Sequence, residues 1–259
     1  MKKQKKRQII GEISTNHQGS IMTIVECRTK NDIDVIFDSG YIAKGIQYSN
    51  FINGNVKDKF IPSYLNVGYV GDGPFVTKIN GKHTYEYDKW GGMLTRCYGK
   101  NQRSTYDDCY VCDEWHNYQK FAQWITENVY DIGDERLELD KDIKIKNNNV
   151  YSPNTCLLLP KRINDVILNR TNDRSAVCLG VYPHGDRFIA VCNQLDAKNR
   201  YIGTFNTKLE AFGAYKKTKE NEIRKIADLY KEKLPKCIYD AIVSYEVQIT
   251  DELEYHKSF

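Results

Sequence analysis

The sequence predicts an α+β fold divided into several small domains. Short runs of alternating apolar and polar residues, which are typical of strands, fill residues 9–79. From Tyr85 the apolar residues recur at helical spacing, and a second group of strand-like runs follows from Ala176. At 259 residues the chain is long enough for two to three small domains. This change of pattern along the chain indicates three consecutive units.

For residues 1–83 the sequence predicts a basic arm followed by a small β-barrel-like domain. Four or five strands are expected, because the apolar runs IMTIVEC, DIDVIFD, YIAKGIQY and YLNVGYV are separated by turn signals such as FDSG and FINGN. The opening MKKQKKRQ is basic and is not followed by an apolar segment. We therefore expect it to be a solvated arm and not a secretory signal.

Residues 84–172 predict two helices followed by a β-β-α unit. Apolar residues recur every three or four positions, as on one face of a helix, in YDKWGGMLTRCY and in EWHNYQKFAQWITENVY. A loop with cysteines joins these two helices. Two short strands are then expected in RLELDKDI and NTCLLLP, with the polar turn KNNNVYSP between them. A helix is expected to begin directly after Pro160, in KRINDVILN.

Residues 173–259 predict a three-stranded sheet and a long helix, after the polar linker NRTNDRSA. The strands are expected in AVCLGVYPH, RFIAVCNQL and RYIGTF. The helix is expected to cover TKLEAFGAYKKTKENEIRKIADLYKEKL, because Thr207 and Glu210 have the spacing of a capping box. Pro235 ends this helix and starts a short last one. The small residues Gly213 and Ala214 are expected to let the long helix approach the sheet.

The eight cysteines indicate a reducing compartment, so we expect a cytoplasmic protein. One structural Zn²⁺ site could be formed by Cys97, Cys109, Cys112 and Cys156. Buried free thiols are the alternative for these four residues. The other cysteines lie on apolar faces and are expected in the cores: Cys27, Cys178, Cys192 and Cys237.

The charge pattern suits a protein that lies on double-stranded DNA. The net charge of +4 is small, but basic residues gather in the first seven positions, at Lys161 and Arg162, and along KKTKENEIRK. Acidic residues gather elsewhere, at Asp107, Asp108, Asp113 and Glu114. A solvated surface of mixed charge is the alternative. Mean hydropathy is −0.62 and no apolar run approaches the roughly 18 residues of a membrane helix, so no membrane partner is expected.

Acidic and amide residues stand where a β-β-α nuclease would carry its metal site. Such an enzyme needs one divalent cation to stabilise the leaving oxygen and a general base to activate water. Its ligands come from the end of the first strand, here Asp140 and Asp142, and from the helix, here Asn164. Asn154 lies in the turn before the second strand, where its amide could brace the loop. Solvated acids at a polar strand end are the alternative.

Five motifs follow one another across residues 85–168: WGGMLTRCY, YDDCYVCDEWHNYQKFAQW, LDKDI, YSPNTC and IN. In this order they resemble the phage-encoded HNH endonuclease family, many of whose members are homing endonucleases. The resemblance implies DNA strand cleavage with a Mg²⁺-type ion. Position by position, it points to Asp140, Asp142, Asn154 and Asn164. It also implies a phage protein that acts in the cytoplasm of a bacterial host.

The chain has Asp140 and Lys141 where members of that family carry histidine. Histidine is the ordinary base because its neutral form is abundant near neutral pH. Aspartate binds a hard cation well and can act as a base, although its usual pKa is lower. His116 is the other candidate base if its helix faces the site, and a histidine on the helix surface or in the core is the alternative.

LGVYPHGDRFIAVCNQLDAKNRYIGTFNTKLEAFGAYKKTKE resembles the AP2-type DNA-binding domain, in which three strands pack on one helix. The resemblance implies that the outer face of the sheet enters the major groove. On a two-residue period, Arg187 and Asn193 share one face of the middle strand. These two residues and Arg200 are the candidate polar contacts, with Tyr182 and Tyr201 as flanking aromatic residues. Ordinary polar residues on a strand surface are the alternative.

The first β unit resembles a small SH3-like barrel that precedes the nuclease unit in phage proteins, through DIDVIFDSG and YSNFINGNVKD. Such a barrel could bind DNA or protein. The whole chain therefore predicts a DNA endonuclease that uses Mg²⁺ or Mn²⁺ and holds its target with flanking domains. Two hypotheses remain beside it: a catalytically inactive DNA-binding protein or regulator, and a protein-interaction factor that interferes with a host system and has little affinity for DNA.

Overall fold

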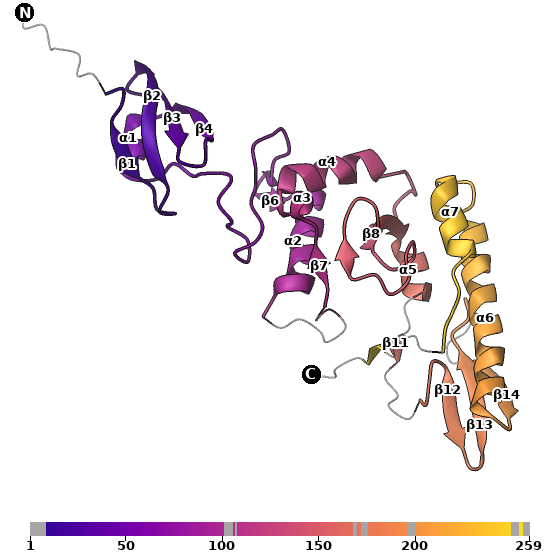
Figure 1. Cartoon of the computed structure of the whole chain (residues 1–259). Coiled ribbons are helices and arrows are strands. Elements are labelled where there is room, and N and C mark those ends of the chain that lie inside the picture. Colours follow the sequence, from indigo (N-terminus) through magenta and orange to yellow (C-terminus); the bar gives the residue numbers. More distant parts are fainter. Residues whose placement is uncertain are drawn as a thin grey trace, which may run out of the picture. The chain divides into compact units, whose positions relative to one another are not determined.

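The computed structural model describes residues 9–100, 106, 108–167, 170–171, 176–195, 200–249 and 254–255 (Figure 1). The predicted α+β class is confirmed. The chain forms two compact units, Met1–Gly99 with Cys112–Gln123 and Lys100–Val111 with Trp124–Phe259. The division into three domains at 83/84 and 172/173 stays a prediction, and the predicted basic arm, residues 1–8, lies outside the described residues. None of the described helices is long and apolar enough to cross a membrane.

The first unit opens with a four-stranded antiparallel sheet in sequence order (Figure 1). Its strands are β1 (Ile13–Thr15), β2 (Ile21–Thr29), β3 (Asp32–Phe37) and β4 (Ile42–Ile46), followed by α1 (Tyr48–Ile52). The predicted FDSG turn is present, with Gly40 at a φ of 86°. One face of the sheet is buried in a core with Met22, Ile24, Ile33, Val35, Phe37 and Phe51.

The strand predicted in YLNVGYV is wrong, because this segment turns back on itself. Leu65 and Asn66 have φ values of 52° and 57°, in the left-handed region that reverses the chain. Tyr64 and Gly68 then exchange backbone hydrogen bonds of 3.0 and 2.9 Å. A small hairpin of β5 (Lys78–Ile79) and β6 (Lys82–His83) follows.

The first predicted helix is confirmed as α2 (Tyr85–Tyr98). The second is interrupted, and forms α3 (Asp113–His116) and α4 (Tyr118–Asn128). Asn117 lies between them in an extended conformation, with a ψ of 114°. Its side-chain oxygen accepts a hydrogen bond of 2.9 Å from the N–H of Gln119, and the backbone on either side of it pairs with Tyr69. The prediction of one continuous helix is wrong because this pairing requires extended backbone.

The second unit contains the predicted β-β-α arrangement. β8 (Leu137–Asp140) pairs antiparallel with β10 (Leu157–Pro160), and α5 (Lys161–Ile167) follows directly. Two short parallel pairings were not predicted. They join β7 (Tyr110–Val111) to β9 (Val150–Tyr151), and β11 (Arg170–Thr171), in the expected linker, to β15 (Glu254–Tyr255).

The second unit also contains the predicted three-stranded sheet and long helix. The strands are β12 (Val181–His184), β13 (Arg187–Cys192) and β14 (Arg200–Phe205), in that order. α6 (Lys208–Leu229) begins with the predicted capping box of Thr207 and Glu210. It ends five residues before the predicted Leu234, because the chain turns at Tyr230 ahead of Pro235 and α7 (Lys236–Val243).

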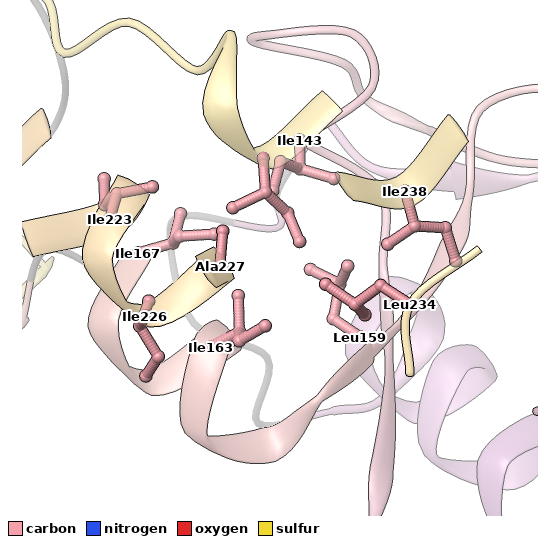
Figure 2. Packing of buried hydrophobic residues seen from close by; sticks show 10 residues of the cluster. Ile143, Leu159, Ile163, Ile167, Ile223, Ile226, Ala227, Leu234 and Ile238 are labelled. Carbon is pink, nitrogen blue, oxygen red and sulfur yellow. The ribbon is translucent and has the colours of Figure 1, made fainter. Parts of the chain in front are cut away.

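α6 contributes to two hydrophobic cores. Its first half supplies Ala211, Phe212 and Tyr215 to a core with the three-stranded sheet. Its second half supplies Ile223, Ile226 and Ala227 to a core with α5, β10 and α7 (Figure 2). One helix therefore joins the candidate DNA-binding sheet to the β-β-α unit.

The close approach of helix and sheet occurs at Gly180 and not at Gly213. A Cβ on Gly213 would meet nothing within 4 Å, so its predicted role is wrong. A Cβ on Gly180 would lie 2.1 Å from the ring of Tyr215, and Gly180 has a φ of 63°. The residue just before β12 must therefore be small and must tolerate the left-handed conformation.

Candidate active site and nucleic-acid interface

The β-β-α unit places the predicted site residues on elements that pack together. Asp140 ends β8 opposite Leu157 of β10, and Glu138 lies opposite Leu159. Side chains two residues apart on a strand share a face, and directly paired residues do too, so all four point to the same side of the hairpin. Leu159 packs on that side with Ile163 of α5 (Figure 2). Asp140 therefore lies on the side of the hairpin where α5 packs.

Glu138 is an acid on this face that was not predicted. Its two-residue spacing from Asp140 on a strand was the signal that could have identified it. Its side chain is 16% exposed, and its Oε1 lies 2.5 Å from Nε of Arg136. This ion pair already balances the charge of Glu138, which makes Glu138 less suited to hold a cation than Asp140.

The Asp140 carboxylate is held by the backbone at one oxygen. Its Oδ1 accepts hydrogen bonds from the N–H groups of Asp142, at 2.9 Å, and Ile143, at 2.8 Å. Its Oδ2 accepts none from the residues that the structure describes. The pKa of Asp140 is raised to about 6, mainly by burial and also by the charge of Asp142, and the two backbone N–H groups and Lys141 oppose the rise. Asp140 thus has one fixed and one available oxygen.

Lys141 is a buried charged residue between the two predicted acids, with 6% of its surface exposed. Its Nζ donates to Oδ1 of Asp142 and to the carbonyl oxygen of Asn148, both at 2.6 Å. It also lies 6.0 Å from the centroid of the Tyr151 ring. Burial acts to lower the pKa of Lys141, but the hydrogen bond and charge of Asp142 outweigh it, so the pKa is raised. Asp142 is therefore the counter-ion of Lys141.

Asn148 braces the loop between β8 and β9, a role that we expected of Asn154. The Nδ2 of Asn148 donates to the carbonyl oxygens of Lys141 and Val150, at 2.8 and 2.7 Å, and its Oδ1 accepts from the N–H of Val150 at 3.1 Å. Asn154 is exposed in the following turn, beside Thr155, whose hydroxyl donates to Val150 O at 2.7 Å. A catalytic role for Asn154 stays a prediction.

Asn164 lies on α5, and its side-chain oxygen, Oδ1, is unusual because it is buried without a hydrogen-bond donor among the described residues. A buried acceptor without a donor costs free energy, and most such groups in proteins are satisfied. Asn164 therefore carries an oxygen that a bound cation would stabilise.

His116 and the predicted acids belong to different compact units. His116 ends α3 in the first unit, where its Nε2 lies 3.4 Å from the hydroxyl of Tyr98 and its Nδ1 lies 3.9 Å from Asp113. Asp140 and Asn164 lie in the second unit. The role of His116 as a base stays a prediction.

The four cysteines of the predicted Zn²⁺ site are divided in the same way, with Cys97 and Cys112 in the first unit and Cys109 and Cys156 in the second. Burial raises the pKa of the Cys109 and Cys112 thiols, and raises that of Cys156 to about 12. Within the described ranges, no group of three or more His, Cys, Asp and Glu residues could hold a metal ion. The Zn²⁺ site stays a prediction.

The other four cysteines were expected in the cores, and two of them are there. Cys178 and Cys192 are buried, whereas Cys27 is only partly buried. Cys237 is exposed, so its prediction is wrong. α7 turns Ile238 and Ile242 toward the core, which leaves Cys237 on the solvent side of this short helix.

The outer face of the three-stranded sheet carries rows of paired side chains. The opposite face packs on α6, as the buried positions of Val181, Ala190 and Cys192 show. The face alternation predicted for β13 is thereby confirmed. From one end of the outer face to the other, the rows are His184 with Arg187, Tyr182 with Ile189 and Thr204, and Val191 with Tyr201.

A β-bulge changes which residues of β14 reach this outer face. The register shifts between Ala190 and Val191, so that Ala190 pairs with Gly203 and Val191 with Tyr201. Tyr201 and Thr204 therefore lie on the same face, and their hydroxyl groups are 2.8 Å apart. Strict alternation along the sequence would have separated them.

Of the predicted contact residues, Arg187, Tyr182 and Tyr201 lie on this face. Arg200 pairs with the buried Cys192, so it begins β14 on the α6 side, at the edge of the sheet, and its predicted place on the outer face is wrong. Arg187 is exposed and donates to Thr204 O at 3.3 Å, while the exposed Arg200 donates to Oε1 of Gln194 at 3.1 Å. Asn193 is exposed just after β13, Tyr201 is exposed and Tyr182 is partly buried. His184, beside Arg187, was not predicted, because its place on this face follows from the strand register. The outer face thus carries Arg187, Tyr182 and Tyr201, with Arg200 at the edge of the sheet.

Comparison of the chain with protein-family models, with curated proteins and with solved structures gives no significant match. The resemblances to the HNH, AP2-type and SH3-like families therefore stay predictions.

Proposed function

We propose that this protein binds double-stranded DNA through the outer face of β12–β14 and cleaves DNA at the β8–β10–α5 unit with one divalent cation, Mg²⁺ or Mn²⁺. The observation that carries the proposal is the buried Oδ1 of Asn164, which has no hydrogen-bond partner within the described part of the chain. It lies on the helix that packs against the same side of the hairpin as Asp140.

The side chains present fit a hard cation. Carboxylate and amide oxygens are the ligands that Mg²⁺ and Mn²⁺ prefer, and Oδ2 of Asp140 and Oδ1 of Asn164 supply one of each. Mg²⁺ is usually held by one or two carboxylates together with water and substrate phosphate, so a small set of protein ligands suits it. When bound, such an ion stabilises the charge on the leaving oxygen of the phosphodiester.

The sheet face supports the DNA-binding part of the proposal. Arginine contacts phosphates and the acceptor edge of guanine, and tyrosine hydroxyls contact phosphates. Arg187 and Tyr201 are exposed there, on a sheet whose other side is closed by α6, and Arg200 is exposed at the start of β14, at the edge of the sheet. Recognition and cleavage then lie on different elements of the same compact unit.

A DNA-binding protein or regulator without cleavage is the second candidate, and one observation favours it. The charge of Asp142 is already balanced by Lys141 at 2.6 Å, so the hairpin offers fewer free acids than the sequence suggested. In that case the β-β-α unit serves as a scaffold only, and DNA binding remains.

The test uses purified full-length protein with supercoiled plasmid and with phage genomic DNA, in Mg²⁺ or Mn²⁺. Asn164→Ala is compared with Asp165→Ala, a change at an exposed residue of the same helix. A gel-shift titration at several salt concentrations is run on the same samples. We expect metal-dependent cleavage by the wild type and by Asp165→Ala, and none by Asn164→Ala, with equal DNA affinity for all three proteins.

Three other outcomes are informative. Cleavage that persists in Asn164→Ala would show that the site is elsewhere. Salt-sensitive DNA binding without cleavage would establish the second candidate. Weak binding that does not change with salt would favour the protein-interaction factor.

A further inference from the structure

We propose that the first unit holds a structural cation site of its own, in which Asp58 and Ser20 supply oxygen ligands to one hard divalent cation, Ca²⁺ or Mg²⁺. The site lies where the turn between β1 and β2 meets the segment that follows α1, residues 54–60. The β-β-α unit with its candidate cleavage site belongs to the second unit. A structural cation in the first unit therefore does not require that the protein cleave DNA.

Asp58 is a buried acid in the segment after α1. Buried and exposed residues alternate in this segment, so that Gly54, Val56 and Asp58 turn to the same side. Val56 packs in the core of the sheet, whereas Asp58 places a carboxylate there with 2% of its surface exposed. Its Oδ1 accepts a hydrogen bond of 2.9 Å from the N–H of Phe60, and its Oδ2 has no hydrogen-bond partner among the residues that the structure describes. A buried carboxylate oxygen in this position favours a positively charged partner.

Ser20 provides another buried oxygen without a partner, at the end of the turn between β1 and β2. The residue is 4% exposed, and within the described ranges its Oγ forms no hydrogen bond. A serine hydroxyl can donate to a carboxylate, yet Ser20 and Asp58 do not bond to each other. Because buried polar atoms in proteins are nearly always satisfied, a further group is needed for both oxygens.

Two amide side chains tie the turn with Ser20 to the segment with Asp58. Oδ1 of Asn16 accepts from the N–H of Ser20 at 2.8 Å, and Nδ2 of Asn16 donates to the carbonyl oxygen of Val56 at 3.0 Å. Oε1 of Gln18 accepts from the N–H of Asp58 at 2.9 Å. These bonds hold the two segments side by side and engage the amides with the backbone. The unpartnered oxygens of Ser20 and Asp58 therefore belong to one small polar cluster at the end of the sheet.

A hard divalent cation fits this cluster better than a soft metal does. Carboxylate oxygens and neutral oxygens are the ligands of Ca²⁺ and Mg²⁺, whereas sulfur and imidazole ligands suit Zn²⁺ and Cu²⁺. Asp58 supplies one carboxylate, which is enough for a cation that keeps part of its water shell. The bound cation would fasten the turn to the segment after α1. It would thereby stabilise a β unit with a small core.

Hydrogen exchange of the full-length protein tests the site in chelator, in Ca²⁺ and in Mg²⁺. Mass spectrometry reads the peptides that cover residues 13–24 and 54–62. We expect the cation to slow exchange in both peptides together, by about 10-fold when its concentration is about ten times its dissociation constant. The ion that gives this protection at the lower concentration is the one that the site prefers.

Variants assign the protection to the two oxygens. Asp58→Asn keeps an oxygen for the N–H of Phe60 but removes the charge, and should abolish the protection. Ser20→Ala removes the hydroxyl and should lower the affinity for the cation by about 10-fold. Asp72→Asn, at an exposed acid of the same unit that pairs with Lys59, is the control and should leave the protection unchanged. Circular dichroism in chelator checks that each variant is folded.

The outcomes are distinct from those of the cleavage test. Exchange in the wild type that is the same with and without cation would show that water satisfies these oxygens, and would overturn the proposal. Protection that persists in Asp58→Asn would do the same. Asn164→Ala alters the candidate site of the second unit and should keep the protection; its loss there would assign the effect to that site. None of these results decides whether the protein cleaves DNA, because the peptides that are read belong to the first unit.

Discussion

Asp140 is a partly buried carboxylate whose ionisation lowers the stability of the second unit. Its pKa rises from 3.8 to about 6 on folding, so the folded state binds its proton more tightly than the unfolded state does. The stability that this preference contributes is fully present below pH 3.8 and is lost as the pH rises through about 6. At neutral pH, without a cation, the ionised side chain therefore weakens the fold.

Asp140→Asn should accordingly stabilise the metal-free protein. The amide keeps an oxygen that can accept from the N–H groups of Asp142 and Ile143 but has no charge to bury. We expect the free energy of unfolding to rise by about 1–3 kcal/mol at neutral pH, and the gain to shrink toward pH 4. Thermal unfolding in a chelator at several pH values measures this. A gain that does not change with pH would mean that the charge is not its cause.

Arg28 forms ion pairs with a cluster of acidic residues in the first unit. Its guanidinium contacts Asp32 and Asp34, at 2.7 and 2.5 Å, and holds the pKa of both carboxyl groups below the usual 3.8. These pairs stabilise the fold above that pH, and the stabilisation is lost as the pH falls through the lower folded pKa values.

Arg28→Met should therefore destabilise the first unit at neutral pH, and the effect should disappear in strong acid. Lys30→Met, at an exposed lysine in the adjacent turn, is the control and should change little. Circular dichroism melting curves between neutral pH and strong acid provide the comparison. Equal losses at every pH would show that Arg28 acts through packing of its stem instead.

At the residue scale the sequence predicted Asp140 and Asn164 as candidate cation ligands, from their places at a strand end and on the following helix, and that role stays a proposal. The interactions of their neighbours could not be predicted. The roles of Lys141 and Asn148 were not identified, because their mutual hydrogen bonds exist only once the loop between them has closed. Loop geometry of this kind has no periodic signature in the sequence.

At the scale of elements, Gly180 determines how closely β12 approaches α6. Gly180→Ala would place a methyl group 2.1 Å from the Tyr215 ring in a backbone conformation with a φ of 63°. We expect a loss of about 2–4 kcal/mol in the free energy of unfolding. Gly213→Ala, on the exposed side of α6, meets nothing within 4 Å and should gain about 0.5–1 kcal/mol.

Urea unfolding of both glycine variants beside the wild type checks this pair of predictions. Both substitutions add the same methyl group, so opposite signs would show that local conformation and packing decide the effect. Similar changes in the two variants would contradict the assigned roles.

Most helices and strands were predictable because their apolar residues repeat with the period of the element. The sheet of the first unit, α2 and the β-β-α unit all follow such patterns. The interruption at Asn117 could not be predicted, because it depends on pairing with Tyr69, 48 positions earlier in the chain. The pairings β7–β9 and β11–β15 were missed because each involves only two residues per strand.

At the scale of the whole molecule, α6 should make the second unit unfold as one cooperative structure. Ile226→Ala removes buried methyl groups from the core that α6 shares with α5, and should cost about 2–5 kcal/mol. Native-state hydrogen exchange should then show an equal loss of protection at β8 and at β13. If β13 keeps its wild-type protection, the two cores unfold separately.

The described contacts group the chain into two units, and the division into three consecutive domains stays a prediction. Periodicity shows that a segment is helical and which side is apolar. It does not show that the apolar residues of one long helix are shared between two partners, as they are along α6.

The sharing of α6 also limits how this protein can be recombined with others. Suppose that β12–β14 and the whole of α6 are replaced by the sheet of another protein. Leu159 and Ile163, which remain in this protein, would then lose the residues in the second half of α6 that bury them. Conversely, if β12–β14 and the whole of α6 were moved into another protein, Ile223, Ile226 and Ala227 would be exposed there, because α5, β10 and α7 would be missing. Chimeras should therefore exchange the segment from β8 to α7 as a single block. A new recognition surface is better made by substitutions on the outer face of the sheet than by exchange of the sheet.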